Sequence, residues 1–242
     1  KRQVSTTLRT GSCEARCEAN ACVESLRLGD VRCNETLWEL PLTADGMRQV
    51  TIIDPAPDRV TWHLSPLEPF AGRDSLRAGD VLCPTYFTGP LDTACNAIGT
   101  EAGLVDIAVL TAPIPIPQEI AAQVELWVYA DLPTSDGLST PLDGLELEVI
   151  STTQGPFVAW STRVSPIVVG QWTPVLVDMS LWGGKSVQLR LSFKTLDGRD
   201  NDHRGIAIGA LRVRTACAAD RTATDRSECE VAYRTPVRGV SD

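Results

Sequence analysis

An acidic stretch, KTLDGRDNDHRGIAIGALRV at residues 194–213, holds the side chains with the clearest capacity for chemistry. Asp197, Asp200, Asn201 and Asp202 lie close together and precede an apolar run. Ca2+ takes about six to eight oxygen ligands from carboxylates, amides and backbone carbonyls. The stretch does not match the EF-hand pattern, and Asp, Asn and Gly are also favoured in plain turns for backbone reasons. We therefore predict either a calcium loop with these four side chains as ligands or a solvated turn between strands.

Enzyme signatures are weak. The only histidines are His63 and His203, whereas a histidine metal site with a bound water usually needs two or three. The sequence contains no H-E-x-x-H, G-x-S-x-G or G-x-G-x-x-G, and GGKS at residues 183–186 fits a hairpin turn better than a P-loop. A glycosidase needs only two suitably spaced carboxylates, and the 31 acidic residues leave that alternative open. We expect a protein that is not an enzyme, with His63 in a structural role.

The eight cysteines are grouped locally along the chain. An even number in local groups favours disulfides formed in an oxidising compartment. The spacing predicts two local bridges, which join Cys83 to Cys95 and Cys217 to Cys229. The remaining four would form two bridges of open connectivity near the N-terminus: Cys13, Cys17, Cys22 and Cys33. The alternative for these four is a zinc site, although such sites usually show tighter C-x2-C knuckles.

The overall charge limits the partners. The 242 residues carry a formal net charge of −9, which argues against a nucleic-acid partner because phosphate binding needs clustered Lys and Arg. No run approaches the ~18 apolar residues of a membrane helix, so we expect no membrane insertion. The chain starts at Lys1 without a Met, and we expect a leader or upstream region to have been removed.

Short alternating runs predict an all-β fold. LELEVIS at residues 145–151 places Leu145, Leu147 and Val149 on one face, and SVQLRLSF at residues 186–193 repeats the pattern. Such alternation is typical of antiparallel sheets with one buried and one wet face. Gly and Pro clusters separate the runs, which favours a β-sandwich or jelly roll. The prolines of APIPIP each remove a ladder donor, so we place that segment on an edge.

We divide the chain into three parts. Residues 1–45 are expected to form a small disulfide-rich N-terminal cap, which is too short to bury a core without its bridges. Residues 46–216 are expected to form the antiparallel β-sandwich (jelly roll). Residues 217–242 would hold a disulfide loop and a C-terminal tail.

The run at residues 172–213 resembles the final strands of MAM-like jelly-roll modules, which occur in secreted bacterial proteins, including accessory domains beside immune-inhibitor-A-type peptidases. The residues that fall into the pattern are Trp172, Val177, Asp178, Ser180, Gly184, Lys185, Val187, Leu189, Arg190, Phe193, Thr195, Asp197, Gly198, Asn201, Gly205, Ile208 and Val213. Looser matches extend the resemblance to roughly residues 58–215. The family usually carries Asp-Asp where this chain has Gly209-Ala210, and this departure weakens the case for a metal held in the family manner.

The chain has six tryptophans. Aromatic side chains dominate the buried area of such folds, so core packing is the default interpretation. Trp62, Trp127 and Trp172 match strand positions of the resemblance and are expected to be structural. Trp182 precedes Gly183-Gly184 on a predicted turn, so we expect it to be exposed and name it as the candidate ligand-binding residue.

These observations predict a secreted or cell-surface binding or adhesion module that recognises carbohydrate or an extracellular protein. That prediction rests on fold analogy. One alternative is a structural subunit of an extracellular filament or coat, which would self-assemble. Another alternative is an accessory domain of a secreted peptidase.

Overall fold

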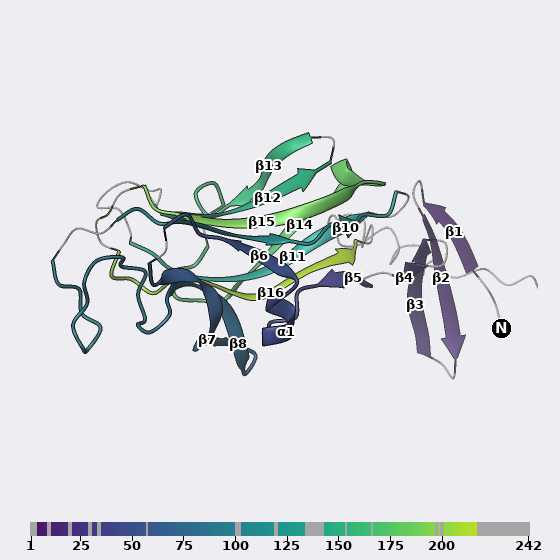
Figure 1. Cartoon of the computed structure of the whole chain (residues 1–242). Helices are drawn as coiled ribbons and strands as arrows, with labels where there is room; N and C mark the ends of the chain where they lie inside the picture. Colours follow the sequence, from purple (N-terminus) through teal and green to yellow (C-terminus); the bar gives the residue numbers. More distant parts are fainter. Residues whose placement is uncertain are drawn as a thin grey trace, which may run out of the picture.

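The computed structural model describes residues 4–8, 11–18, 21–28, 31–32, 35–56, 58–99, 103–118, 121–133, 143–152, 154–165, 167–196, 198 and 201–216, with only the backbone described for residues 4–32 and for Gln154. Within these ranges the chain is dominated by antiparallel strands in two facing six-stranded sheets (Figure 1). The predicted all-β sandwich is confirmed. No helix in the described ranges has the length and apolar character needed to cross a membrane.

One layer, called sheet I, has the strand order β13-β12-β15-β9-β6, and β10 pairs with β15 beside this path. Its strands are β13 (Gln154–Ser161), β12 (Gly144–Ser151), β15 (Ser186–Lys194), β9 (Asp106–Thr111), β6 (Val50–Ile53) and β10 (Ile114–Pro115). The proline-rich segment thus contributes only a two-residue ladder, as expected where prolines remove hydrogen-bond donors.

The other layer, sheet II, has the strand order β14-β11-β16-β8-β7, and β5 pairs with β16. Its strands are β14 (Thr173–Asp178), β11 (Ala122–Asp131), β16 (Gly205–Thr215), β8 (Arg73–Asp80), β7 (Val60–Phe70) and β5 (Thr36–Glu39). Because β5 pairs with β16 and Leu40 is buried in the core, residues 36–40 belong to the sandwich, although the sequence placed them in the N-terminal segment.

The core lies between the two sheets and follows the predicted alternation. Leu145, Leu147 and Val149 are fully buried, as are the apolar positions of β15. The facing layer contributes the inward residues of β11 and β16: Val124, Leu126, Val128, Ile208, Leu211 and Val213. Trp62 donates from Nε1 to the Ile107 carbonyl (3.3 Å), a hydrogen bond that joins β7 of sheet II to β9 of sheet I.

Short elements close the sandwich. The single turn α1 (Ala44–Met47) has Thr43 as its N-cap, whose hydroxyl accepts from the Gly46 amide (3.1 Å). The 3-10 turn η1 (Ser180–Trp182) follows β14 and leads into β15.

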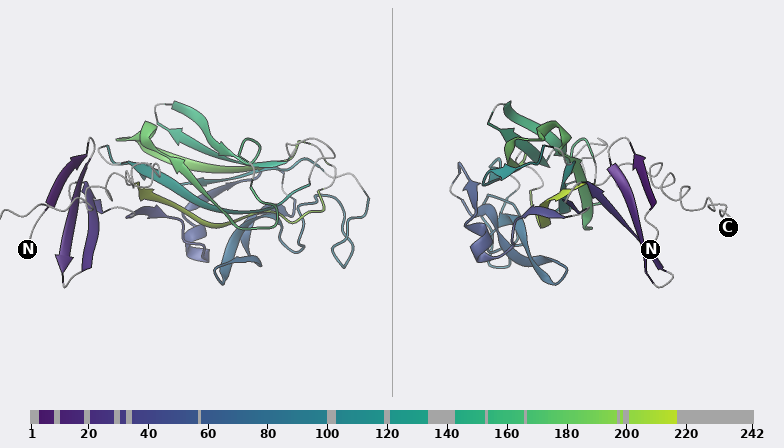
Figure 2. Two further views of the ribbon diagram at one scale, coloured as in Figure 1. Left: turned by 180° about the vertical axis from the view of Figure 1, so that it is seen from behind. Right: turned by 90° about the vertical axis from the view of Figure 1, so that its right-hand side faces the viewer.

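The N-terminal region forms a sheet of its own in the order β1-β2-β3-β4 (Figure 2). Its strands are β1 (Val4–Leu8), β2 (Gly11–Glu18), β3 (Ala21–Leu28) and β4 (Val31–Arg32). Cys17 on β2 and Cys22 on β3 are register partners in its central hairpin.

Candidate functional site

Strand β11 directs an aromatic pair away from the core. Its inward positions are apolar and buried, so its alternate positions, including Trp127 and Tyr129, lie on the outer face of sheet II, where both rings are half-buried. Polar residues continue this outer row, with Glu125 before the aromatic pair and Asp131 after it. The strand thus presents a charged, an aromatic and a second charged region in sequence.

Two further rings join this pair. Phe70 lies 5.2 Å from Trp127 and 4.9 Å from Trp172 between ring centroids, and Tyr129 lies 5.7 Å from Trp172. Trp172 directly precedes β14, which pairs with β11, so the antiparallel register accounts for its position beside Tyr129. We call Phe70, Trp127, Tyr129 and Trp172 the aromatic platform. Trp127 and Trp172 are therefore not core residues, whereas Trp62 is.

Phe70 reaches the platform because β7 is irregular near the hairpin tip. The ladder between β7 and β8 pairs Ser65 with Ser75 and then Phe70 with Arg73, so residues 66–69 have no counterpart of equal length on β8. Two prolines, Pro66 and Pro69, fall in this bulge, where missing amide donors do no harm. The hairpin turn itself, Ala71 and Gly72, adopts positive φ values of 50° and 76°, typical of a tight two-residue connection.

Gly209 is required beneath this ring. The register of β16 against β11 skips Gly209 between Ala210 and Ile208, so it lies at a bulge. A Cβ built on it would lie 2.6 Å from the Phe70 Cβ, which leaves no room for a side chain. The resembled family carries aspartate near position 209. An aspartate side chain at this position would clash with the Phe70 ring, so the two cannot be present together.

The charged region before the platform is the Glu125 cluster, comprising Glu125, Arg212 and Arg214. The carboxylate of Glu125 accepts from Arg212 Nη2 (2.5 Å) and from Trp127 Nε1 (3.1 Å), and it lies 3.1 Å from Arg214 Nε. Burial opposes ionisation of Glu125, but the hydrogen bonds from Arg212 and Trp127 outweigh it and hold the pKa of Glu125 below its usual value. Glu125 thereby fixes the orientation of the Trp127 ring.

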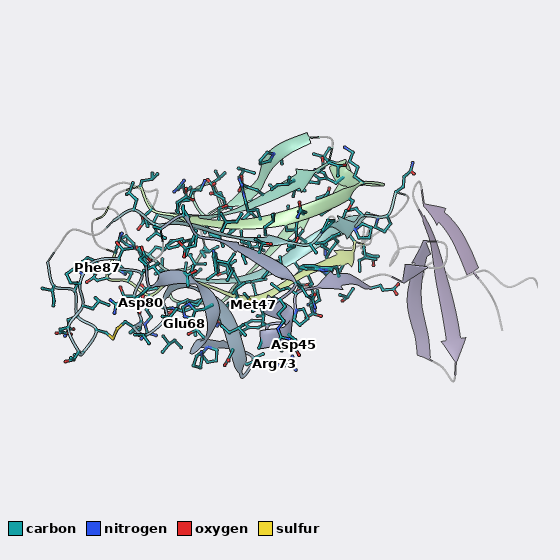
Figure 3. The ribbon with its side chains drawn as sticks, viewed as in Figure 1. Asp45, Met47, Glu68, Arg73, Asp80 and Phe87 are labelled. Carbon is teal, nitrogen blue, oxygen red and sulfur yellow. A yellow bond between two sulfur atoms is a disulfide. The ribbon has the colours of Figure 1, made fainter. Side chains whose placement is uncertain are left out.

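The charged region after the platform is the Asp131 cluster, comprising Asp131, His203, Arg204 and Glu68. His203 Nδ1 lies 3.2 Å from Asp131 Oδ1, and Arg204 Nη1 lies 3.3 Å from the buried Glu68 Oε1. Figure 3 shows Glu68 between Asp80 and the hairpin tip that carries Arg73. Burial, together with Asp131, raises the pKa of Tyr129, which keeps this phenol neutral beside the cluster.

Beneath the Asp131 cluster, Arg77 is 0% exposed. Its guanidinium donates to four backbone carbonyls, those of Asp80 (2.9 Å), Cys83 (3.2 Å), Thr85 (3.1 Å) and Arg204 (3.0 Å). Its Nε lies 3.5 Å from Glu68 Oε2, and its guanidinium covers Gly79, where a Cβ would lie 2.7 Å from Arg77 Cζ. One side chain thus ties the β7 bulge to two loops at the end of the sandwich.

The acidic stretch is described only in part. Asp197 and Asp200 lie outside the described residues, and Asp202 is exposed. Asn201 is 1% exposed, its carbonyl accepts from Thr85 Oγ1 (3.0 Å), and both Oδ1 and Nδ2 of its amide lack a hydrogen-bond partner. Buried amides are nearly always partnered, so this orphaned group fits a bound ion or water beside it. Among the described residues, no three His, Cys, Asp or Glu side chains group as a metal site.

The predicted exposure of Trp182 is wrong. The ring is 3% exposed, belongs to the core, and packs edge-on against Phe157 with 5.6 Å between centroids. The 3-10 turn of η1 points consecutive side chains in different directions, so Leu181 is exposed instead. A glycine-flanked turn therefore did not imply an exposed ring, and the basis for Trp182 as a ligand-binding residue is removed.

We expect Trp182→Ala to destabilise the fold by about 3–5 kcal/mol, because a large buried aromatic ring leaves a cavity. Leu181→Ala, the exposed neighbour, should change stability by less than about 0.5 kcal/mol. Denaturant unfolding monitored by circular dichroism compares the two variants with the parent. Equal stabilities for both variants would contradict the burial of Trp182.

The structure confirms one predicted disulfide, Cys83–Cys95, which closes a loop after β8. Cys33, Cys217 and Cys229 lie outside the described residues, and only the backbone is described for Cys13, Cys17 and Cys22. The bridges predicted for these six cysteines stay predictions.

No family model matches the chain, and no curated protein matches it either. Among solved structures, the K1 cleaved adhesin domain of Lys-gingipain from Porphyromonas gingivalis W83 is similar at 13% identity and a TM-score of 0.45, covering 76% of this chain and 98% of that one. The CBM22-1 xylan-binding domain of Paenibacillus barcinonensis Xyn10C is similar at 12% identity and a TM-score of 0.43, covering 78% and 99%.

A third similar structure is the glycoside hydrolase domain of Endo-D from Streptococcus pneumoniae R6, at 12% identity and a TM-score of 0.41. The match covers 68% of this chain but only 21% of that one. Likenesses of this size carry no information about ligand or activity.

Proposed function

We propose that this protein is a non-catalytic binding module that recognises carbohydrate on the outer face of sheet II. The observation that carries the proposal is the aromatic platform, four contiguous half-buried rings on a solvent-facing sheet. Aromatic faces stack on the apolar faces of sugar rings, and neighbouring polar groups bind hydroxyls. Three of the rings, Trp127, Tyr129 and Trp172, stand on or beside the paired strands β11 and β14, and Glu125 orients one of them, Trp127. The platform is therefore held rigidly before any ligand binds.

The test is binding of polysaccharides by the purified protein, measured by affinity electrophoresis and then by calorimetry. Suitable probes are xylan, mixed-linkage β-glucan, galactomannan and starch. Retarded migration in at least one of these, abolished by changes in the platform, is the expected result. Failure to bind any glycan, together with capture of an extracellular protein on the same face, would replace this ligand class with the alternative of a protein partner.

A secreted or cell-surface location is part of the proposal. The Cys83–Cys95 disulfide supports it, because such bonds persist mainly in oxidising compartments. The resemblance to MAM-like modules, and with it a role beside a secreted peptidase, stays a proposal of the same kind.

A structural role in a filament or coat is the second candidate. Edge strand β6 of sheet I exposes Ile52 and Ile53 at 41% each, and an apolar strand edge is a template for pairing with another copy. Size-exclusion chromatography distinguishes the two, since a monomer that binds glycan supports the module and a polymer supports the assembly.

We also propose that the acidic stretch binds Ca2+, with Asn201 Oδ1 as one ligand and with Asp197, Asp200 and Asp202 supplying carboxylates. The support is the buried, unpartnered amide of Asn201. Ca2+ binds through oxygen ligands of this kind, and an ion bound only by the folded state raises stability by about 2.7 kcal/mol at a hundredfold excess over its Kd.

Adding Ca2+ to the chelator-treated parent is therefore expected to raise its melting temperature, and Asn201→Ala and Asp200→Ala should abolish the rise. Asp74→Ala, at the exposed hairpin tip, is the matched control and should keep it. Differential scanning calorimetry with and without Ca2+ provides the measurement. A parent whose melting temperature ignores Ca2+ would leave the solvated turn as the correct interpretation.

A further inference from the structure

The charged side chains beside the aromatic platform are already paired within the protein. In the Glu125 cluster, one carboxylate contacts two guanidinium groups, and Glu39 stands opposite Arg212 in the register of β5 and β16. In the Asp131 cluster, Glu68 contacts both Arg204 and the buried Arg77.

Charge balance on this face is close to neutral. The Glu125 cluster with the neighbouring Glu39, and the Asp131 cluster with the underlying Arg77, together hold as many carboxylates as guanidinium groups. The four carboxylates are Glu39, Glu68, Glu125 and Asp131, and the four guanidinium groups are Arg77, Arg204, Arg212 and Arg214. Farther out, Arg73 and Asp74 of the hairpin tip offset each other, and Arg59 pairs with Asp80. The exposed Asp178 at the far edge and the exposed Asp202 beside His203 each add one negative charge, so the remaining excess is negative. The whole chain has a formal net charge of −9 at pH 7, so the rest of the protein surrounding this face is acidic.

We infer that the platform binds a neutral polysaccharide rather than one that carries uronate or sulfate groups. The inference rests on the proposed glycan-binding function and names the ligand class of the same site. An anionic sugar would gain no net electrostatic attraction from this face, and the negative charge of the whole protein would repel it. It could capture Arg212 or Arg204 only by competing with carboxylates that are largely buried, and that competition would leave a buried charge without its partner.

The polar ends suit hydroxyl groups instead. A hydroxyl both donates and accepts, so it can bind the outer edge of an ion pair without breaking it. Asp131 and His203 are partly exposed, and the side chain of Arg204 is 52% exposed, so acceptor and donor groups border the Tyr129 ring. A neutral sugar stacked on Tyr129 or Trp172 would find both kinds of partner at its rim.

The experiment compares neutral probes (xylan, mixed-linkage β-glucan, galactomannan, starch) with acidic probes (alginate, polygalacturonate, chondroitin sulfate). Dissociation constants are measured at 50 mM and at 1 M NaCl for the parent and for Trp172→Ala. We expect at least one neutral probe to bind with less than about a twofold change between the two salt concentrations, because no charge pair with the ligand is available for salt to screen. We expect every acidic probe to bind at least tenfold more weakly than that neutral probe. We expect Trp172→Ala to bind the neutral probe roughly 30-fold or more weakly than the parent does.

Three results would overturn the inference, and they separate it from the proposed function. An acidic probe that binds more tightly than every neutral one, with affinity that falls in 1 M salt, overturns the neutral ligand class while glycan binding stands. A neutral probe that binds Trp172→Ala as well as the parent places the site elsewhere. No binding of any probe in either class refutes the proposed function and the inference together.

Discussion

Replacing Trp172 or Trp127 by alanine is expected to weaken glycan binding by roughly 30-fold or more while the fold persists. Each ring touches Phe70 and is partly exposed on the outer face of sheet II, so we expect the sheet to stay intact when the ring is removed. A Trp side chain that becomes buried at the centre of an interface typically contributes about 2 kcal/mol or more to the binding free energy, as judged by truncation to alanine. A loss of that size corresponds to an affinity about 30-fold lower. Calorimetric titration with the best-binding neutral polysaccharide measures the effect.

The matched control is Phe157→Ala. Phe157 is 51% exposed on β13 of sheet I, so it tests whether loss of any exposed aromatic ring weakens binding. It should leave the affinity unchanged. Far-ultraviolet circular dichroism confirms folding of all three variants. Folded Trp127→Ala and Trp172→Ala variants with the parent's affinity would show that the platform is not the binding site.

Much of the fold was predictable because burial on one face of a strand leaves a two-residue period. The alternation of β12 and β15 predicted which side chains are buried, and the spacing of Cys83 and Cys95 predicted their disulfide. The contribution of residues 36–40 was missed because β5 is only four residues long and pairs with β16 near the other end of the chain. Short strands paired across the whole sequence leave little local signal.

The candidate site was only partly predictable. The alternation of β11 already placed Trp127 and Tyr129 opposite to Leu126 and Val128, so the outward aromatic pair was readable from the sequence. Phe70 was not readable, because its position depends on the Pro66–Pro69 bulge, which shifts the register of one strand against the other. The bulge also places Glu68 in contact with Arg77, and no local sequence pattern predicts this contact.

Arg77→Met is expected to destabilise the protein by about 3–5 kcal/mol, because it leaves Glu68 with one partner fewer in a buried setting and frees carbonyls of two loops. For a domain of this size the melting temperature should fall by roughly 6–20 °C. Arg73→Met makes the same chemical change at the exposed hairpin tip and should cost less than about 0.5 kcal/mol. Equal melting temperatures for the two variants would contradict the role assigned to Arg77.

A double variant separates charge from hydrogen bonding. In Arg77→Met/Glu68→Leu, the carboxylate that faced Arg77 is gone, so any part of the loss that came from an uncompensated buried charge should be recovered. The carbonyls of Asp80 and Arg204 still lack the guanidinium, and that part of the loss should remain. Full recovery would mean that Arg77 serves only to neutralise Glu68. No recovery would mean that its hydrogen bonds to the loops carry the whole effect, and those bonds hold the Asp131 cluster in place beside the platform.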